Sequence, residues 1–320
     1  MKAAVVQGFD NPPQYKHFAE PVLEPNELLV QVKAAALTQL VRNQASGRHY
    51  SSNVSLPFIP GVDGVGGLQD GRRVYFAFPK PPFGTMAELV AVPGEFCVPL
   101  PDNLDDIKAA AAGNAGMSSW AALCERAKFI AGESVLINGA TGVSGKLAIQ
   151  IAKYLGAKNI IATGRNQAVL DTLPALGADV VISLNQPADK LVQLFHQELR
   201  ARNISVILDY LWGPSAEQLM QAISGRGSRE GEPRIRYVQI GAIAGATISL
   251  PAAILRSSGL ELLGSGLGSV SYAKLMQVIG NFMQAVVPGN FFIATQTASL
   301  KDVETAWGKD TGEERLVFTI

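Results

Sequence analysis

Residues 135–145 read Val-Leu-Ile-Asn-Gly-Ala-Thr-Gly-Val-Ser-Gly, a short apolar strand that runs directly into three glycines spaced three residues apart. In such a turn Gly139 permits a tight reversal, Gly142 lets the backbone approach a pyrophosphate, and Gly145 allows the next helix to pack closely on the strand. Apolar residues then recur with helical spacing to about Leu155. The free N–H groups and positive dipole end of that helix favour phosphate. The stretch therefore predicts a dinucleotide site made by Gly139, Ala140, Thr141, Gly142, Val143 and Gly145.

The chain beyond this stretch alternates between strand-like and helical patterns. A helical pattern from about Asp105 to Ala127 precedes it. Strands are predicted at 135–138, 159–163, 179–182, 204–209, 236–240 and 259–263, and helices near 145–156, 166–175, 188–201, 214–224 and 251–257. Such alternation is typical of a doubly wound parallel sheet with helices on both faces. Six strands make a complete dinucleotide-binding fold.

The segments on either side of this region have a different character. From Met1 to about Ser118 the chain is strand-like and interrupted by proline and glycine, which predicts an antiparallel, partly barrel-like domain. After residue 270 an amphipathic helix is expected near 273–285, followed by a strand, a helix and a strand.

The composition is that of a folded globular protein with no bias toward polyanions. The 320 residues are 48% hydrophobic and 17% charged, which is enough for a large core. Basic and acidic residues number 27 each, so nucleic acid is a disfavoured partner. Only Cys97 and Cys124 occur, a usage that suits a reducing compartment. No signal peptide or run of roughly 18 apolar residues is present, so we expect a cytoplasmic protein without a membrane partner.

The end of the second predicted strand indicates which dinucleotide is bound. A fold that prefers NAD usually carries Asp or Glu about 20 residues after the glycine motif. Here the strand ends in Thr163-Gly-Arg-Asn166, with no carboxylate. Arg165 supplies a permanently charged fork suited to a 2′-phosphate, which favours NADPH, although it could instead only solvate the start of the next helix. Gly164, Thr163 and Asn166 are further candidate contacts, but Thr163 and Asn166 could equally cap that helix.

Five motifs together resemble the medium-chain dehydrogenase/reductase superfamily over essentially the whole chain. Within it, the zinc-free quinone oxidoreductases are the most similar branch. The motifs are Pro60-Gly-Val-Asp-Gly-Val-Gly66, Phe83-Gly-Thr-Met-Ala-Glu-Leu-Val90, Ala110-Ala-Ala-Gly-Asn-Ala-Gly-Met-Ser-Ser-Trp120, Asn138-Gly-Ala-Thr-Gly-Val-Ser-Gly145 and Ile240-Gly-Ala-Ile-Ala-Gly245.

The resemblance implies how the two kinds of structure are combined. It implies a Rossmann domain, residues 121–267, whose doubly wound parallel six-stranded sheet is inserted in a GroES-like, mostly β catalytic domain, residues 1–120 and 268–320. It places the active site between the two domains. It also implies a homodimer joined through the sixth Rossmann strand, near 260–264, and a hydrophobic edge strand of this kind needs some cover.

The resemblance also indicates that the catalytic metal of the alcohol dehydrogenases is missing. The three places of the zinc ligands in those enzymes fall here on Thr38, Val62 and Asn114. Valine cannot bind an ion, and neutral oxygen or amide groups are poor substitutes for thiolates. Without a Lewis acid, alcohol oxidation loses its usual electrophile. Reduction of a quinone or a conjugated carbonyl remains feasible, because the acceptor itself delocalises the incoming charge.

Further cofactor contacts are implied at three turns. The turn after the fifth strand, with Gly241 and Ala242, would lie beside the nicotinamide ribose. The glycine-rich turn after the sixth strand would approach the carboxamide through Ser265 or Gly266, although a purely structural turn explains those glycines almost as well. Ser118 is a candidate nicotinamide contact by the same comparison, and otherwise a helix cap.

The candidate proton donor lies in Ser46-Gly-Arg-His-Tyr50. Zinc-free reductases of this superfamily often place a tyrosine after a glycine in the segment that faces the nicotinamide, and Tyr50 resembles it with one extra residue between them. Its hydroxyl could protonate the oxygen that becomes an enolate as hydride arrives. His49 is the nearest rival, because imidazole titrates near neutrality. Thr38 replaces an asparagine usual at the start of a nearby helix, and the whole segment could instead be an exposed polar loop.

These observations predict an enzyme that transfers hydride from NADPH to a quinone or an α,β-unsaturated carbonyl compound without zinc. An NADPH-binding protein with little turnover, serving as a redox sensor or a structural relative, is the main alternative. A metal-dependent alcohol dehydrogenase with displaced ligands is a third. The sequence does not distinguish a quinone from an enone or an enoyl thioester.

Overall fold

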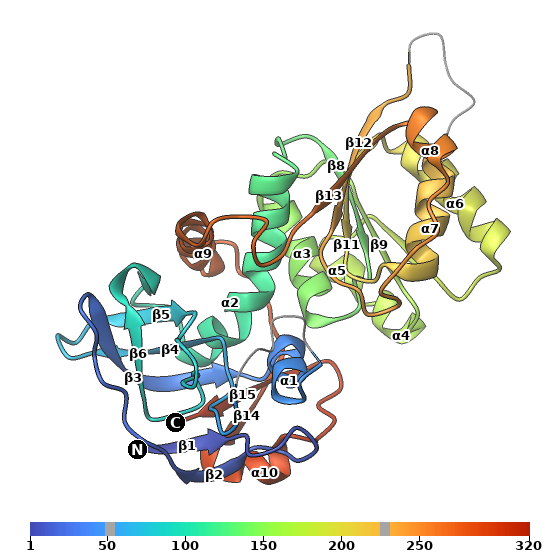
Figure 1. Cartoon of the computed structure of the whole chain (residues 1–320). Coiled ribbons are helices and arrows are strands. Elements are labelled where there is room, and N and C mark those ends of the chain that lie inside the picture. The colour runs from blue at the N-terminus through green and yellow to red at the C-terminus, as the bar shows by residue number, and fades with distance from the viewer. Residues whose placement is uncertain (49–54, 225–230) are drawn as a thin grey trace. The chain divides into compact units, whose positions relative to one another are not determined.

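The computed structural model describes residues 1–48, 55–224 and 231–320, which form two compact units (Figure 1). The split unit is made of two chain segments, Met1–Met117 and Tyr272–Ile320. The inserted unit is the continuous segment Ser118–Ser271. Tyr50 and His49, the candidate proton donors, lie outside the described residues.

The inserted unit contains one parallel sheet of six strands. In spatial order the strands are β10 (Val180–Ser183), β9 (Ile160–Gly164), β8 (Ser134–Asn138), β11 (Ile204–Asp209), β12 (Arg234–Gln239) and β13 (Gly259–Gly264). Counted along the chain this order is 3-2-1-4-5-6, the arrangement of a complete dinucleotide-binding fold. The predicted doubly wound six-stranded sheet is therefore confirmed, with each strand within two residues of its expected bounds.

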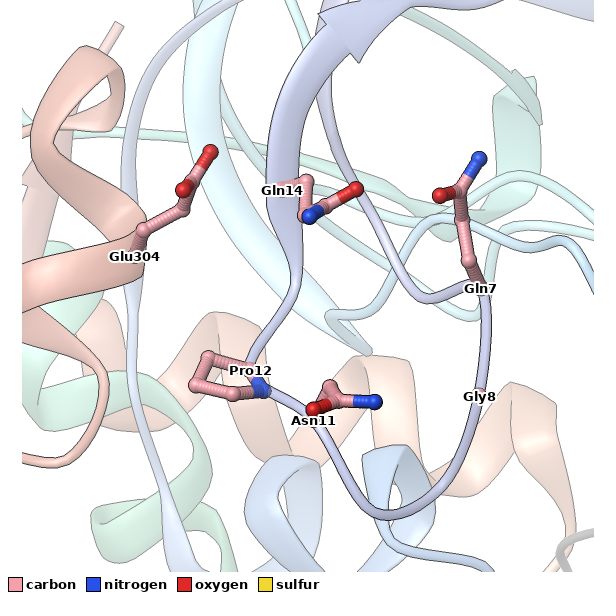
Figure 2. A pocket seen from close by; sticks show the side chains of 6 residues that line it. All are labelled: Gln7, Gly8, Asn11, Pro12, Gln14 and Glu304. Atoms are coloured by element: carbon pink, nitrogen blue, oxygen red, sulfur yellow. The ribbon is translucent and has the colours of Figure 1, made fainter.

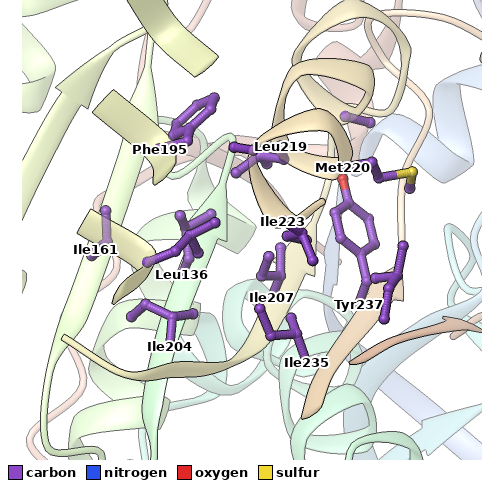
Figure 3. Close-up of a cluster of buried hydrophobic side chains, with 14 of the residues drawn as sticks. Leu136, Ile161, Phe195, Ile204, Ile207, Leu219, Met220, Ile223, Ile235 and Tyr237 are labelled. Carbon is purple, nitrogen blue, oxygen red and sulfur yellow. The ribbon is translucent and has the colours of Figure 1, made fainter. Parts of the chain in front are cut away.

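One face of this sheet is covered by α6 (Ala188–Ala201), α7 (Gly213–Ile223) and α8 (Ala252–Arg256). Side chains of the strands, such as Leu136 and Ile207, meet Phe195 of α6 and Leu219 of α7 in one buried cluster (Figure 3). The neighbouring residues Val135 and Ile137 of β8 are also fully buried. A strand that is covered on both faces needs apolar residues at every position, which explains the continuous apolar run before the glycine motif.

Three helices follow the first two strands. Helix α3 (Val143–Tyr154) packs on β8 and β9. The single helix expected near 166–175 is instead two short ones, α4 (Gln167–Leu170) and α5 (Leu173–Leu176). Pro174 stands in the first turn of α5. Because proline has no N–H to donate to a preceding turn, it suits the start of a helix and interrupts one that is already running.

The helical segment before β8 also has two parts. It begins as α2 (Asp106–Trp120) and continues as η2 (Ala121–Arg126), a π-helical stretch. A wide turn of this kind is an insertion into regular helical hydrogen bonding and is frequent at functional sites.

The split unit is built on a seven-stranded sheet. Its order is β14 (Thr295–Ser299), β15 (Arg315–Thr319), β3 (Glu27–Ala36), β4 (Asp63–Leu68), β5 (Arg73–Ala77) and β7 (Cys97–Pro99), with β6 (Leu89–Pro93) also paired to β3. All these pairs are antiparallel except β14 with β15, because η3 (Leu300–Asp302) and α10 (Val303–Ala306) carry the chain back to the same end. Strands β1 (Lys2–Val5) and β2 (Gln14–His17) form a separate antiparallel pair, and the remaining helices are α1 (Gln39–Ala45), η1 (Gly94–Phe96) and α9 (Tyr272–Val286).

Both cysteines are free and half-buried. Burial raises the pKa of the Cys97 thiol and of the Cys124 thiol to about 11 in each case. Among the described residues, no helix has the length and apolar character that crossing a bilayer requires.

Candidate dinucleotide site

Each of the three positions of the motif needs glycine for a different reason. Gly139 has a φ of +90°, in the region that side chains disfavour. A Cβ on Gly145 would lie 2.5 Å from both the Cα of Ala140 and the carbonyl oxygen of Gly139, so only glycine lets the helix approach the turn. A Cβ on Gly142 would meet no atom of the described residues within 4 Å. The middle glycine thus faces open space, as close approach of a pyrophosphate requires.

The start of α3 is prepared for an anion. Gly142 is its N-cap, and no side chain of the described residues caps the helix there. The N–H groups of the first turn have no acceptor within an α-helix, and they carry the positive end of the helix dipole. Val143 therefore begins a helix whose free donors suit a phosphate.

Thr163 supports the glycine turn from inside the fold. Its side chain is fully buried, and its hydroxyl donates to Oδ1 of Asn138 over 2.7 Å. The hydroxyl oxygen of Thr163 also accepts a hydrogen bond from the backbone N–H of Gly139 over 3.2 Å. The Thr163 hydroxyl, a candidate cofactor contact in the sequence, is thus already engaged as donor and as acceptor, and its position favours shaping of the turn.

Arg165 lies exposed just beyond the end of β9. Within residues 1–48, 55–224 and 231–320 its guanidinium has no hydrogen bond or ion pair, while its carbonyl oxygen accepts from Nδ2 of Asn185 over 2.7 Å. Asn166 caps α4 by accepting from the N–H of Val169. Gly164 is required because a Cβ there would overlap the side chain of Thr141. The backbone around Arg165 is thus fixed, and its charge is available.

The turns after β12 and β13 are held at their ends. Gly241 precedes Ala242 and lies so close to the end of the neighbouring strand β11 that a Cβ would approach the carbonyl oxygen of Tyr210 to 2.5 Å. Ser265 donates its N–H to the carbonyl of Gln239, and Gly266 donates its N–H to the hydroxyl of Ser269. These are the two turns that the sequence predicts beside the nicotinamide.

Arg126 and Tyr210 connect the π-helical region to this edge of the sheet. The Nε–H of Arg126 donates to the carbonyl oxygen of Gly264 over 2.6 Å, and an Nη1–H donates to that of Ser269 over 3.3 Å. Arg126 therefore binds both ends of the turn after β13. The hydroxyl of Tyr210 lies 2.7 Å from that of Ser119 and also bonds the predicted contact Ser118. Burial raises the pKa of Tyr210 to about 12, so the phenol is neutral.

Two buried carboxylates were missed by the sequence analysis. Asp209 ends β11 beneath the glycine turn, and burial raises its pKa. Asp63 starts β4 in the split unit, where its carboxylate accepts from the hydroxyl of Tyr75 over 2.7 Å. Burial raises the pKa of Asp63 to about 6, while Tyr75 and Arg315 oppose that shift. A carboxylate at the end of an apolar strand was the available signal for Asp209.

The three residues that the resemblance places at the zinc-ligand positions of the alcohol dehydrogenases lie in the split unit. Thr38 is 3% exposed and caps α1, its hydroxyl accepting from the N–H of Val41. Val62 packs against the apolar core of that unit, and Asn114 lies in α2. In the part of the chain that the structure describes, no three His, Cys, Asp or Glu side chains are grouped so that they could hold a metal ion.

Among the described residues, cavities also lie away from the glycine turn. One of about 240 Å³ in the split unit is lined by Gln7, Gly8, Asn11, Pro12, Gln14 and Glu304 (Figure 2). Another of about 450 Å³ lies where β11 and β12 begin, at the edge of the parallel sheet opposite the glycine turn. Neither contains a predicted site residue, so the glycine turn remains the candidate site.

The strand order, the glycine turn and the free helix N-terminus define a dinucleotide-binding protein of the Rossmann class. A family model described as a zinc-binding dehydrogenase matches residues 144–281. A protein of Emericella nidulans described as a "probable NADPH-dependent quinone reductase" is 27% identical, with 99% of each chain covered. The 2-methylene-furan-3-one reductase of Solanum lycopersicum is 32% identical over 51% of this chain and 46% of its own length.

A solved structure has the same fold over the whole chain. The quinone oxidoreductase of Thermus thermophilus, also solved in complex with NADPH, superposes with a TM-score of 0.81 at 24% identity and covers all of both chains. The chain belongs to the medium-chain dehydrogenase/reductase superfamily, with a Rossmann sheet inserted in a GroES-like, mostly β fold. Within that superfamily it falls in the NADPH:quinone reductase-like branch.

Proposed function

We propose that this protein is a zinc-independent oxidoreductase that transfers hydride from NADPH to a quinone or an α,β-unsaturated carbonyl compound. The observation that carries the proposal is the pairing of an open glycine turn at Gly142 with the Arg165 guanidinium, which is unpartnered among the described residues. No carboxylate stands at the end of β9 to favour the ribose of NAD. The names of the fungal and tomato relatives, one a quinone reductase and the other a furanone reductase, agree with these acceptor classes.

Different residues of the chain bind different parts of the cofactor. NADPH supplies the hydride from the C4 position of its nicotinamide. The backbone of Gly139–Val143 and Gly145 holds the pyrophosphate, and Arg165 pairs with the 2′-phosphate, assisted by Gly164 and Asn166. Gly241, Ala242, Ser265, Gly266 and Ser118 face the nicotinamide end. The domain that binds NADPH spans 121–267, and residues 1–120 with 268–320 form the catalytic domain.

The acceptor reacts without a metal. Val62 offers no ligand where the zinc enzymes of the superfamily have one, and a conjugated acceptor needs chiefly a positioned hydride donor. Tyr50 donates the proton that completes reduction, with His49 or water as the other possible donors, and Thr38 lies at the start of α1. The partner is thus a small molecule and not a nucleic acid.

Two wider features complete the proposal. The protein is a homodimer joined along β13, whose outer edge needs a partner strand. It works in the cytoplasm, because two unpaired cysteines suit a reducing compartment.

The test measures oxidation of NADPH and of NADH at the nicotinamide absorbance, with one simple quinone and one simple enone, with and without a chelator. We expect turnover that prefers NADPH and that the chelator does not change. Turnover abolished by the chelator and restored by zinc would contradict the metal-free mechanism. Tight NADPH binding with no turnover for any acceptor would favour a redox-sensing or structural role instead.

A further inference from the structure

A buried polar network lies beneath the glycine turn, and Asp209 is at its centre. The carboxylate closes β11 and is fully buried. Its Oδ1 accepts hydrogen bonds from Nδ2 of Asn138 (2.8 Å), the N–H of Leu211 (2.9 Å) and the N–H of Trp212 (3.1 Å). Its Oδ2 accepts from the hydroxyl of Tyr237 (2.7 Å) and again from the N–H of Trp212 (3.2 Å). Every donor thus points at a single acceptor group.

The first branch of the network reaches the glycine turn. Asn138 is the last residue of β8 and directly precedes Gly139. Its amide links Asp209 on one side to the hydroxyl of Thr163 on the other, and that hydroxyl accepts from the N–H of Gly139. The Nδ2 of Asn138 also donates to the hydroxyl of Ser215 over 3.0 Å. The carboxylate therefore helps to fix the plane in which the glycine turn begins.

The second branch holds the turn between β11 and α7. Trp212 has a φ of +58°, an unusual value for a residue with a side chain, and its N–H is held by both carboxylate oxygens. The side chain of Leu211 lies against Gly139, because a Cβ on that glycine would come within 2.8 Å of the Leu211 Cγ. The shape of this turn therefore limits the position of the glycine turn.

The third branch reaches the turn after β12. The carbonyl oxygen of Asp209 accepts from the N–H groups of Ile240 (2.7 Å) and Gly241 (3.1 Å). The N–H of Ala244 donates to the carbonyl of Leu211 over 2.8 Å. One residue thus anchors all three turns at the carboxyl ends of β8, β11 and β12, where an open parallel sheet binds its ligand.

We propose that Asp209 is a positioning residue for the NADPH site, which holds the glycine turn and the two turns beside it in the shape that the cofactor requires. The inference rests on the proposed function, since it concerns the same site. Asp209 does not contact the cofactor in this account. Its carboxylate acts through Asn138 and Leu211, its backbone carbonyl holds Gly241, and it transfers no proton.

The test compares Asp209→Asn with a matched variant, Glu133→Gln. Glu133 accepts from Arg236, from the hydroxyl of Ser205 and from the N–H of Ile130, at the amino-terminal edge of the same sheet. Both variants replace an engaged carboxylate by an amide in the same unit, and both should lower the Tm. We expect the Kd for NADPH to rise about tenfold in Asp209→Asn, because hydrogen bonds to a charged group are the stronger ones. It should change less than about twofold in Glu133→Gln.

A second pair of variants separates the branches of the network. Leu211→Ala removes the side chain that lies against Gly139 and leaves the carboxylate in place, and Leu211 is only half-buried, so the fold should tolerate the change. We expect its Kd for NADPH to rise roughly threefold to fivefold with little change in Tm. Tyr237→Phe removes a donor that touches none of the turns, so it should lower the Tm and leave the Kd within about twofold of wild type.

Steady-state kinetics provides a further readout that a purely structural role would not change. At saturating NADPH, Asp209→Asn should keep the kcat and the acceptor KM close to wild type while its KM for NADPH rises. An equal Kd for NADPH in Asp209→Asn and wild type would overturn the inference. A Kd for NADPH that rises in Glu133→Gln as much as in Asp209→Asn would also overturn it. If Asp209→Asn fails to fold, an unchanged Kd in Leu211→Ala would overturn it. Failure of the wild type to bind NADPH would instead contradict the proposed function.

Discussion

The contrast between Arg165 and its neighbours shows which side chains at the candidate site are available to a ligand. Thr163 and Asn166 were equally plausible contacts in the sequence, but the Thr163 hydroxyl and the side-chain oxygen of Asn166 already make hydrogen bonds within the fold. The Arg165 guanidinium has no partner among the described residues, while its backbone is tied by Asn185. The backbone is thus placed before an anion binds, and only the exposed side chain has to be ordered.

Replacing Arg165 by alanine should therefore weaken NADPH binding selectively. We expect Arg165→Ala to lose about 1.5–3 kcal/mol of NADPH binding free energy, the range for a charged hydrogen bond, and to leave NADH binding nearly unchanged. Titration with each cofactor measures the two Kd values. Arg256→Ala, an exposed arginine at the end of α8, is the control and should change neither. Equal losses for both cofactors would remove Arg165 from its proposed role.

Asp63 should make the stability of the protein depend on pH in an uncommon direction. Its folded-state pKa of about 6 lies above its ordinary value of 3.8, chiefly because of burial. The contribution of Asp63 to the free energy of unfolding is then complete below about pH 4 and is lost as the pH rises through about 6. A shift of about 2 units corresponds to at most about 3 kcal/mol.

The comparison of wild type with Asp63→Asn isolates this contribution. Between pH 4 and 6.5, the free energy of unfolding of the wild type should fall relative to that of the variant, as measured by denaturant titration at each pH. Tyr75→Phe should move the transition to higher pH, because the Tyr75 hydroxyl stabilises the carboxylate. A difference between wild type and Asp63→Asn that stays constant over this range would show that Asp63 does not titrate there.

At the level of single elements, hydrophobic periodicity predicted the inserted sheet well because its signals are local. Helix α6 spans Ala188–Ala201 as expected, since its apolar residues recur on one face over four turns. The division of 166–175 into α4 and α5 was not predicted, although Pro174 was visible, because helical spacing continues across the break. The π-helical stretch η2 has no sequence pattern that distinguishes it from an α-helix.

The glycine turn and α3 allow the structural and ligand roles of glycine to be separated. In Gly145→Ala the added methyl group would overlap Ala140 and Gly139, so the Tm should fall clearly. In Gly142→Ala the methyl group points into open space, so the Tm should fall only by the smaller amount that an alanine N-cap costs a helix, while the Kd for NADPH rises at least several-fold. Thermal unfolding and cofactor titration of both variants check this. Normal NADPH binding by Gly142→Ala would mean that the pyrophosphate does not approach this glycine.

At the scale of the whole molecule, the sequence could not predict contacts between residues far apart in the chain. Asp209 meets Tyr237 and Asn138 only because β11 lies between β8 and β12. The charge of Arg315 acts on Asp63 because the chain returns to the split unit after residue 271. Neither relation has a local pattern, so the sequence predicted the turns of the site but not the polar groups that support them.

The proposed dimer can be tested on the outer strand of the parallel sheet. Leu262 lies on β13 and is 41% exposed, and a charged residue on an edge strand opposes pairing with a second copy. We expect Leu262→Arg to shift the protein from dimer to monomer in light scattering coupled to gel filtration. Leu255→Arg is the matched control, because Leu255 is 47% exposed but lies on α8, and it should remain dimeric. A wild-type monomer would contradict the dimer itself.

The two half-buried thiols have a consequence for an enzyme that handles conjugated acceptors. Enones and quinones are electrophiles that alkylate cysteine, and the thiolate is the form that they attack. With both pKa values at about 11, only about one thiol in ten thousand is ionised at pH 7. Neither cysteine thus offers an appreciable thiolate to an acceptor of this kind, so alkylation of these two residues should be slow.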